Sequence, residues 1–272
     1  MDITELFGGG GIFYNLGIAI WNVAMKLIGA TAMQTPQSFS PWTWTYVVDD
    51  VMSWTLGFGA MMLNIFYMIG IIRQSSNLKD NFTLEIMVDS FIKVIGGNFL
   101  LINGTTLMSL FFQIAALLSG GFLSMEEVHF AQIDLDVGAI FFYNSLGLFF
   151  MAFCLVCAGT IFLTIYGRYL QLYLLVATGP FAWSTVPGGQ GISNTASSWI
   201  RTFLSKCFEI VVIAIAVSIA SRMCGSIRFG DLDGIGENFD GAIQALQNMA
   251  TMLILTGAVK GADMFMKRTF GL

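Results

Sequence analysis

Long apolar runs recur along this chain, and short polar connections separate them. A helix that crosses the hydrocarbon core of a bilayer needs about 20 mostly apolar residues. Five runs approach or exceed that length, at 51–72, 94–118, 138–167, 207–224 and 241–259. The pattern predicts an all-α, polytopic membrane protein with about five transmembrane helices.

The fourth run is the weakest of the five. Lys206 and Glu209 lie at its beginning and Arg222 lies at its end, whereas residues 210–221 are uncharged and rich in Val, Ile and Ala. We keep this run as a span, because without it the basic connections 168–206 and 260–268 would lie on opposite sides of the membrane.

Lysine and arginine fall almost entirely in alternate connections. Nine of the twelve lie after the first, third and fifth runs or just before the second and fourth: Arg73, Lys79, Lys93, Arg168, Arg201, Lys206, Lys260, Lys267 and Arg268. The opposite connections hold Arg228 and ten carboxylates: Asp49, Asp50, Glu126, Glu127, Asp134, Asp136, Asp231, Asp233, Glu237 and Asp240. Because Lys and Arg favour the cytoplasmic side of short loops, we predict an outward N-terminus and a cytoplasmic C-terminus.

The composition leaves no room for a large water-soluble domain. Hydrophobic residues make up 56% of the 272 residues and charged residues 11%, whereas soluble domains carry about 25% charged residues. We therefore expect a multi-pass protein of the cytoplasmic (inner) membrane. Asp2 and Glu5 occupy the place of the basic region of a signal peptide, so we expect the N-terminal segment to remain in the mature protein.

Residues 1–50 are predicted to form an N-terminal interfacial segment and an outer loop, ahead of a five-span domain at 51–272. Residues 12–30 have helical spacing and one narrow polar stripe, made by Asn15, Asn22 and Lys26. This stripe suits an amphipathic helix in the outer interface or against an aqueous cavity. The alternative is a sixth span, which would place an acidic N-terminus without basic residues in the cytoplasm.

Prolines and aromatic residues follow this helix. They are Pro36, Pro41, Trp42, Trp44 and Tyr46. We expect them to form an outer loop whose aromatic rings lie at the level of the lipid headgroups.

Cytoplasmic amphipathic helices are expected in two places, one just before the second span and one just after the third. Residues 81–97 form the first, with Asp89 and Lys93 paired at a spacing of four, and it leads straight into the second span. After the third run comes a helical cytoplasmic loop at 168–206. Its helix should stop at Pro180, and a new helix should begin at about Ser193 after a turn-rich stretch.

The second span carries one polar stripe. Asn98, Thr105, Ser109 and Gln113 follow one another at spacings of seven, four and four, so they line one side of a helix. Two interpretations remain open. The stripe forms hydrogen bonds between packed helices, or it is the uncharged wall of a pore.

The sequence offers no catalytic or metal-binding constellation. Cys154 and Cys157 form a C-x-x-C in the middle of the third span, where we expect packed, apolar thiols. The one histidine, His129, lies in an acidic outer connection without a cysteine nearby. We therefore expect neither an enzyme nor a bound cofactor or metal ion.

Two stretches of the cytoplasmic loop resemble a known family. The segment GRYLQLYLLVATGPFAW at 167–183 and the segment SSWIR at 197–201 resemble the cytoplasmic junction of the TrbL-type subunit of conjugation and type IV secretion machines. Members of that family place a basic residue before a long aliphatic helix, then Gly-Pro, small residues and a second helix with its own basic residue. The predicted topology of residues 50–265 is also similar to that family.

The resemblance implies an oligomeric channel or scaffold subunit that helps to move single-stranded DNA with its attached relaxase. It also implies other secretion-machine subunits as partners, such as a conjugative ATPase and a pilus-base or outer partner, alongside membrane lipid. Short outer connections favour a compact machine of a Gram-positive-type mobile element. We assign the following residues to the cytoplasmic mouth and junction: Arg168, Gly179, Pro180, Trp183, Arg201, Lys206 and Glu209.

The cations of this set would make the inner mouth positive. The alternative is that they serve as a topology signal, with Lys206 paired to Glu209. On the outer side, ten carboxylates would repel a bare polyanion. We expect a cationic partner to dock there, at Asp231, Asp233, Glu237 and Asp240.

A stand-alone secondary transporter or small-solute channel is the alternative function. Such proteins place ionisable residues or broken helices at mid-membrane and often contain inverted repeats. The second, third and fifth spans of this chain have uncharged centres, which favours the DNA-transfer subunit.

Overall fold

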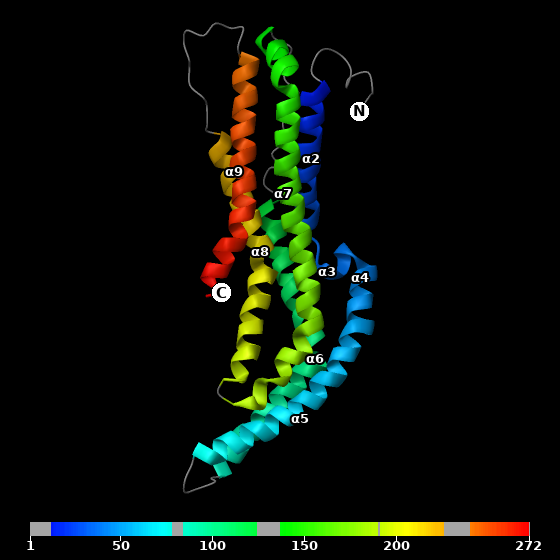
Figure 1. Cartoon of the computed structure of the whole chain (residues 1–272), viewed down its shortest axis with the longest axis vertical. Helices are drawn as coiled ribbons and strands as arrows, with labels where there is room; N and C mark the ends of the chain where they lie inside the picture. Colours follow the sequence, from blue (N-terminus) through cyan, green and yellow to red (C-terminus); the bar gives the residue numbers. More distant parts are fainter. Residues whose placement is uncertain (1–11, 78–83, 124–136, 190, 226–239, 272) are drawn as a thin grey trace. The chain divides into compact units, whose positions relative to one another are not determined.

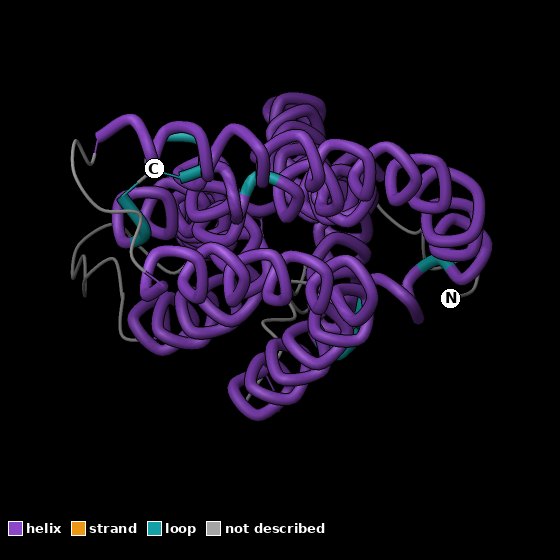
Figure 2. Tube along the Cα trace, turned by 90° about the horizontal axis from the view of Figure 1, so that it is seen from below, coloured by secondary structure: helices purple, strands orange, loops and turns teal. Residues whose placement is uncertain are grey.

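The computed structural model describes residues 12–77, 84–123, 137–189, 191–225 and 240–271 (Figure 1). Within this part of the chain, every regular element is a helix, and loops are confined to short stretches (Figure 2). The elements are α2 (Ile12–Ala32), α3 (Pro36–Phe39), α4 (Pro41–Thr45), η1 (Tyr46–Val51), α5 (Met52–Asn77), α6 (Leu84–Leu123), α7 (Val137–Ser184), η2 (Val186–Gly188), α8 (Ser193–Gly225) and α9 (Asp240–Thr269). The predicted all-α class is confirmed.

Five helical stretches among the described residues are long and apolar enough to cross a membrane. They are Pro41–Arg73, Val88–Phe122, Leu146–Gly188, Ser193–Cys224 and Ala245–Thr269. Each overlaps one of the five predicted spans, and the weak fourth run is among them. These helices make the chain a multi-pass membrane protein.

The predicted outer loop at residues 36–46 is wrong in one respect, because most of it is helical. Pro36 and Pro41 stand at the beginnings of α3 and α4, where the missing N–H of proline costs no helical hydrogen bond. A π-helical turn, η1, then leads into α5. The helical stretch of the first span therefore begins at Pro41, ahead of the apolar run itself.

Helix α7 is one unbroken element of 48 residues. At 1.5 Å per residue it is about 72 Å long, more than twice the hydrocarbon thickness of a bilayer, which is about 30 Å. The prediction that Pro180 stops this helix is wrong, since α7 continues to Ser184. It ends where the hydroxyls of Ser184 and Thr185 donate to the carbonyl oxygens of Phe181 and Ala182, at 2.7 and 2.6 Å.

Two other predicted boundaries are confirmed. Helix α8 begins at Ser193. Helix α6 runs from Leu84 through the second span without a break, and its first half carries the predicted ion pair between Lys93 and Asp89, with Nζ and Oδ2 2.6 Å apart.

The chain forms two compact units, each assembled from three separate stretches. Unit 1 comprises Met1–Met33, Ala116–Gly167 and Glu209–Phe265, and unit 2 comprises Gln34–Ala115, Arg168–Phe208 and Met266–Leu272. Helices α7 and α8 contribute to both units, whereas α5 belongs to unit 2 alone.

Unit 1 is built around α2 and the first half of α7. A row of α2 side chains at alternating spacings of four and three is buried: Tyr14, Ile18, Trp21, Met25, Ile28 and Ala32. Tyr14 stacks on Phe150, with ring centroids 4.3 Å apart, and accepts a hydrogen bond from Asn248 of α9 at 3.2 Å. Helix α2 is thus a core helix of its unit.

Helix directions within unit 2 agree with a chain that crosses a membrane repeatedly. In unit 2, Gly59 of α5 lies against Pro180 and Gly70 lies against Pro187, so the first and third spans run in the same direction. In the same unit, Arg168 contacts Lys206 and Trp183 contacts Trp199. The fourth span therefore runs opposite to the third, as alternate crossings require.

Candidate functional site

Arg168, the first residue of the candidate junction, is buried in unit 2 with 3% of its surface exposed. Its Nε donates to the carbonyl oxygen of Lys206 at 3.2 Å, and its Nη2 donates to that of Cys207 at 3.3 Å. The third guanidinium nitrogen, Nη1, is buried and makes no hydrogen bond within the described residues. Arg168 therefore fastens α7 to α8 through two successive backbone carbonyls.

The sequence left open whether these cations make the inner mouth positive or serve as a topology signal. Lys206 and Glu209 are also buried, at 7% and 2% exposure, and of the three cations only Arg201 is exposed. The sequence gives the spacing of these charges along the chain but not the packing of α7 on α8.

The second part of the junction is a cluster of two tryptophans and two glycines, here named the tryptophan clasp. Trp183 of α7 and Trp199 of α8 meet edge to face, with ring centroids 5.4 Å apart and planes at 83°. A side chain at Gly179 would lie 2.9 Å from Trp183 Cζ2 and 3.3 Å from Trp199 Cζ2. The Trp183 ring also covers Gly104 of α6, where a Cβ would overlap it.

Pro180 packs beside the clasp. It is buried, and a Cβ at Gly59 of α5 would lie 2.9 Å from the Pro180 carbonyl oxygen. The Gly-Pro pair that carries the family resemblance is thus a point of close helix approach in unit 2. Small residues permit such approach between membrane helices.

The polar stripe of α6 divides into a packed middle and exposed ends. Ser109 accepts a hydrogen bond from Nε2 of Gln37 at 2.6 Å and donates to the carbonyl oxygen of Thr105 at 2.8 Å. Asn98 and Gln113 are exposed, and Thr105 is half-buried. Ser109 therefore fits the interpretation of hydrogen bonding between helices. The exposed ends of the stripe, Asn98 and Gln113, fit the alternative interpretation, the uncharged wall of a pore.

Gln37 reaches Ser109 because its own segment is anchored to α7. Tyr169 and Tyr173 donate from their hydroxyls to the carbonyl oxygens of Gln34 and Pro36, at 3.1 and 2.7 Å. Phe39 stacks on Tyr169 with centroids 3.9 Å apart. Sequence reasoning missed these residues, and no local pattern could have found them, because the partners are more than 130 positions apart.

Replacing Ser109 by alanine should destabilise unit 2 by about 0.6 kcal/mol, the typical contribution of a hydrogen bond between membrane helices. The measurement is equilibrium unfolding of the detergent-solubilised protein. The change Gln37→Leu should cost a similar amount, and the double variant should cost less than the sum of the two. If the two effects simply add, Gln37 and Ser109 are energetically independent.

Other predicted site residues fall partly outside the described residues. Asp231, Asp233 and Glu237 lie there, and Asp240 is the first residue of α9 with an undescribed side chain. The thiols of Cys154 and Cys157 are buried in unit 1, with Cys154 Sγ 3.6 Å from Met252 Sδ. No group of three metal-ligating side chains occurs among the residues that the structure describes.

The fold and this junction define a multi-pass α-helical membrane protein. Comparison with known proteins gives no significant match to a family model, a curated protein or a solved structure.

Proposed function

We propose that the chain is a channel or scaffold subunit of a conjugative type IV secretion machine in the cytoplasmic membrane. In this role it acts as an oligomer and supports the passage of single-stranded DNA with its attached relaxase. The observation that carries the proposal is the junction of α7 and α8. Trp183 and Trp199, one from each of the two stretches that resemble the TrbL-type subunit, contact each other in unit 2. Arg168 of the first stretch donates hydrogen bonds to the α8 backbone at Lys206 and Cys207, beyond the second stretch.

The wall chemistry of unit 2 also supports passage of a polyanion. The α6 stripe carries amide and hydroxyl side chains and no charge. A carboxylate in such a wall would repel nucleic acid, and a row of cations would hold it too tightly for transit. An uncharged polar wall does neither.

A secondary transporter is the second candidate, and one observation favours it. Arg168, Lys206 and Glu209 are buried in membrane-length helices, and ionisable residues in such places often mark transport pathways. Two of the three guanidinium nitrogens of Arg168 are, however, committed to backbone carbonyls. This arrangement suits a fixed fastening between helices better than a group that moves ions.

Deleting the gene from a donor cell that carries the mobile element should abolish transfer of that element. Filter mating measures the transfer frequency, and the unaltered gene supplied from a second site should restore it. Donor growth and mobile-element copy number should not change. Transfer at the parental frequency after deletion would refute the proposed function, and loss of uptake of a small solute in its place would favour the transporter.

A further inference from the structure

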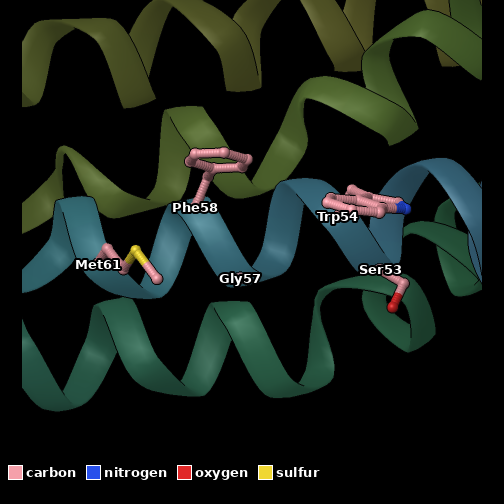
Figure 3. Close-up of a pocket in the computed structure, with 5 residues that line it drawn as sticks. All are labelled: Ser53, Trp54, Gly57, Phe58 and Met61. Atoms are coloured by element: carbon pink, nitrogen blue, oxygen red, sulfur yellow. The ribbon is translucent and has the colours of Figure 1, made fainter.

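Helix α5 separates its side chains into two exposed faces. Ser53, Gly57, Ala60 and Asn64 follow one another at spacings of four, three and four, so they share one face, and all four are exposed. The large apolar side chains turn elsewhere: Trp54, Phe58, Met61, Ile65 and Met68 are exposed on the neighbouring face. In Figure 3, Ser53 points to the α6 side of α5 while the Phe58 ring points to the opposite side.

The contact between α5 and α6 sets the two helices in register. A Cβ built at Gly97 of α6 would lie 2.6 Å from Cδ1 of Leu63, so the helices touch closely at this level. Asn64 and Asn98 are the next residues on each helix. Helices α5 and α6 run side by side in opposite directions (Figure 1). In such an antiparallel pair, the residues that follow a mutual contact turn to the same side, because a twofold axis perpendicular to the pair relates them. Asn64 and Asn98 therefore lie at one depth on one common face.

Both amides are polar groups within membrane-length helices. Asn64 donates to the carbonyl oxygen of Ala60 and Asn98 to that of Val94, each at 3.2 Å, and both side chains are exposed. Hydrocarbon offers no partner for the remaining polar groups of an amide, and transfer of such a group from water without partners costs several kcal/mol. Contact of this face with lipid is therefore unfavourable, whereas contact of the apolar Trp54 and Phe58 side of α5 with lipid is favourable.

We infer that α5 supplies a second wall of the hydrated path, next to the polar stripe of α6. Ser53, Gly57, Ala60 and Asn64 join Asn98 and Thr105 in one uncharged face, and the large apolar side chains of α5 face lipid. This inference rests on the proposed function. The small residues leave space along the face, since nothing lies within 4 Å of a Cβ built at Gly57. A shallow hollow of about 320 Å³ lies at the border with the apolar side, where Ser53 and Gly57 meet Trp54, Phe58 and Met61 (Figure 3).

Cysteine reactivity in the assembled machine tests the inference. Single changes Asn64→Cys, Asn98→Cys and Ile65→Cys are made in the full chain, whose four native cysteines are all buried. Membranes from donor cells are treated with a small, charged, water-soluble thiol reagent. Asn64→Cys and Asn98→Cys should react at least about tenfold faster than Ile65→Cys, because the reactive thiolate forms in water and not in hydrocarbon. Ile65 is the matched control, since it is adjacent in sequence and 56% exposed on the apolar side.

Different failures have different meanings. If Asn98→Cys reacts and Asn64→Cys reacts no faster than the control, α5 is not a wall, while the α6 stripe and the proposed function stand. If oxidation instead joins Asn64→Cys of two copies by a disulfide, the face is an interface between copies and the inference is overturned. Ala60→Cys, a smaller change on the same face, repeats the test if Asn64→Cys does not accumulate. The mating assay tests the proposed function separately.

Discussion

Replacing Gly70 by alanine should destabilise unit 2 by about 1–3 kcal/mol, the usual cost of forcing an extra methyl group into a packed contact. Gly70 is buried, and a Cβ built there overlaps the carbonyl oxygen of Pro187. The obstacle is backbone, so no side-chain rotation can relieve it, and α5 must move away from the η2 turn. Equilibrium unfolding in detergent measures the loss.

Gly57→Ala on the same helix is the matched control. Nothing lies within 4 Å of a Cβ at that position, so its stability should be unchanged or higher, by up to about 1 kcal/mol from better helix propensity. An equal loss in the two variants would mean that Gly70 matters through helix flexibility and not through its contact with Pro187.

The second large effect concerns Arg168. Arg168→Ala should destabilise unit 2 by about 3 kcal/mol or more, because it removes two charge-assisted hydrogen bonds of roughly 1.5–3 kcal/mol each. Arg168→Lys should fail to restore the loss, since an ammonium lacks the planar fork that reaches two successive carbonyl oxygens. Arg168→Met should cost less than alanine, because it keeps much of the packing and removes a buried charge. The same unfolding measurement compares the three variants.

A change at Arg201 provides the control for charge alone. Arg201 is exposed on α8, and Arg201→Lys should leave the free energy of unfolding within about 0.5 kcal/mol of the parent. If Arg168→Lys is as stable as the parent protein, the positive charge at position 168 matters and the hydrogen-bond geometry does not. The interpretation of Arg168 as a simple topology signal would then be favoured.

Much of the fold could be predicted because membrane crossing depends on local, additive properties. Twenty consecutive apolar residues have the same preference for hydrocarbon wherever they pack. The fourth span illustrates this, since its uncharged centre predicted it in spite of the flanking charges, and the structure contains it. The start of α8 at Ser193 and the Asp89–Lys93 pair are local in the same sense.

Predictions failed where a residue's neighbour lies far away in the chain. Pro180 looked like the end of a helix, yet α7 continues beyond it, with Pro180 buried against Gly59 of α5. Likewise, the sequence assigned Arg168 to the cytoplasmic junction but did not show that it is buried against α8. In both cases the local preference is small compared with the packing of a distant helix.

For the polar stripe of α6, the sequence again predicted the local feature and missed the distant contacts. The sequence predicted a polar stripe on α6 from spacing alone, but only the structure shows that Ser109 is bound by Gln37, 72 positions away. Likewise, the contact of Leu63 with Gly97 brings Asn64 into line with Asn98. Spacing fixes which side chains share a face of one helix, and it says nothing about the helix that covers that face.

The amino-acid sequence by itself therefore determined the all-α class, the five membrane-length helices and the approximate ends of most of them. Those features follow from hydrophobic length and helical periodicity, which each segment carries alone. The tertiary structure decided which polar and charged groups are covered, as at Arg168 and Ser109, and which helix faces remain open, as along Ser53 to Asn64. A side chain is buried only when a second helix covers it. The spacing of residues along one helix does not specify which other helix does so.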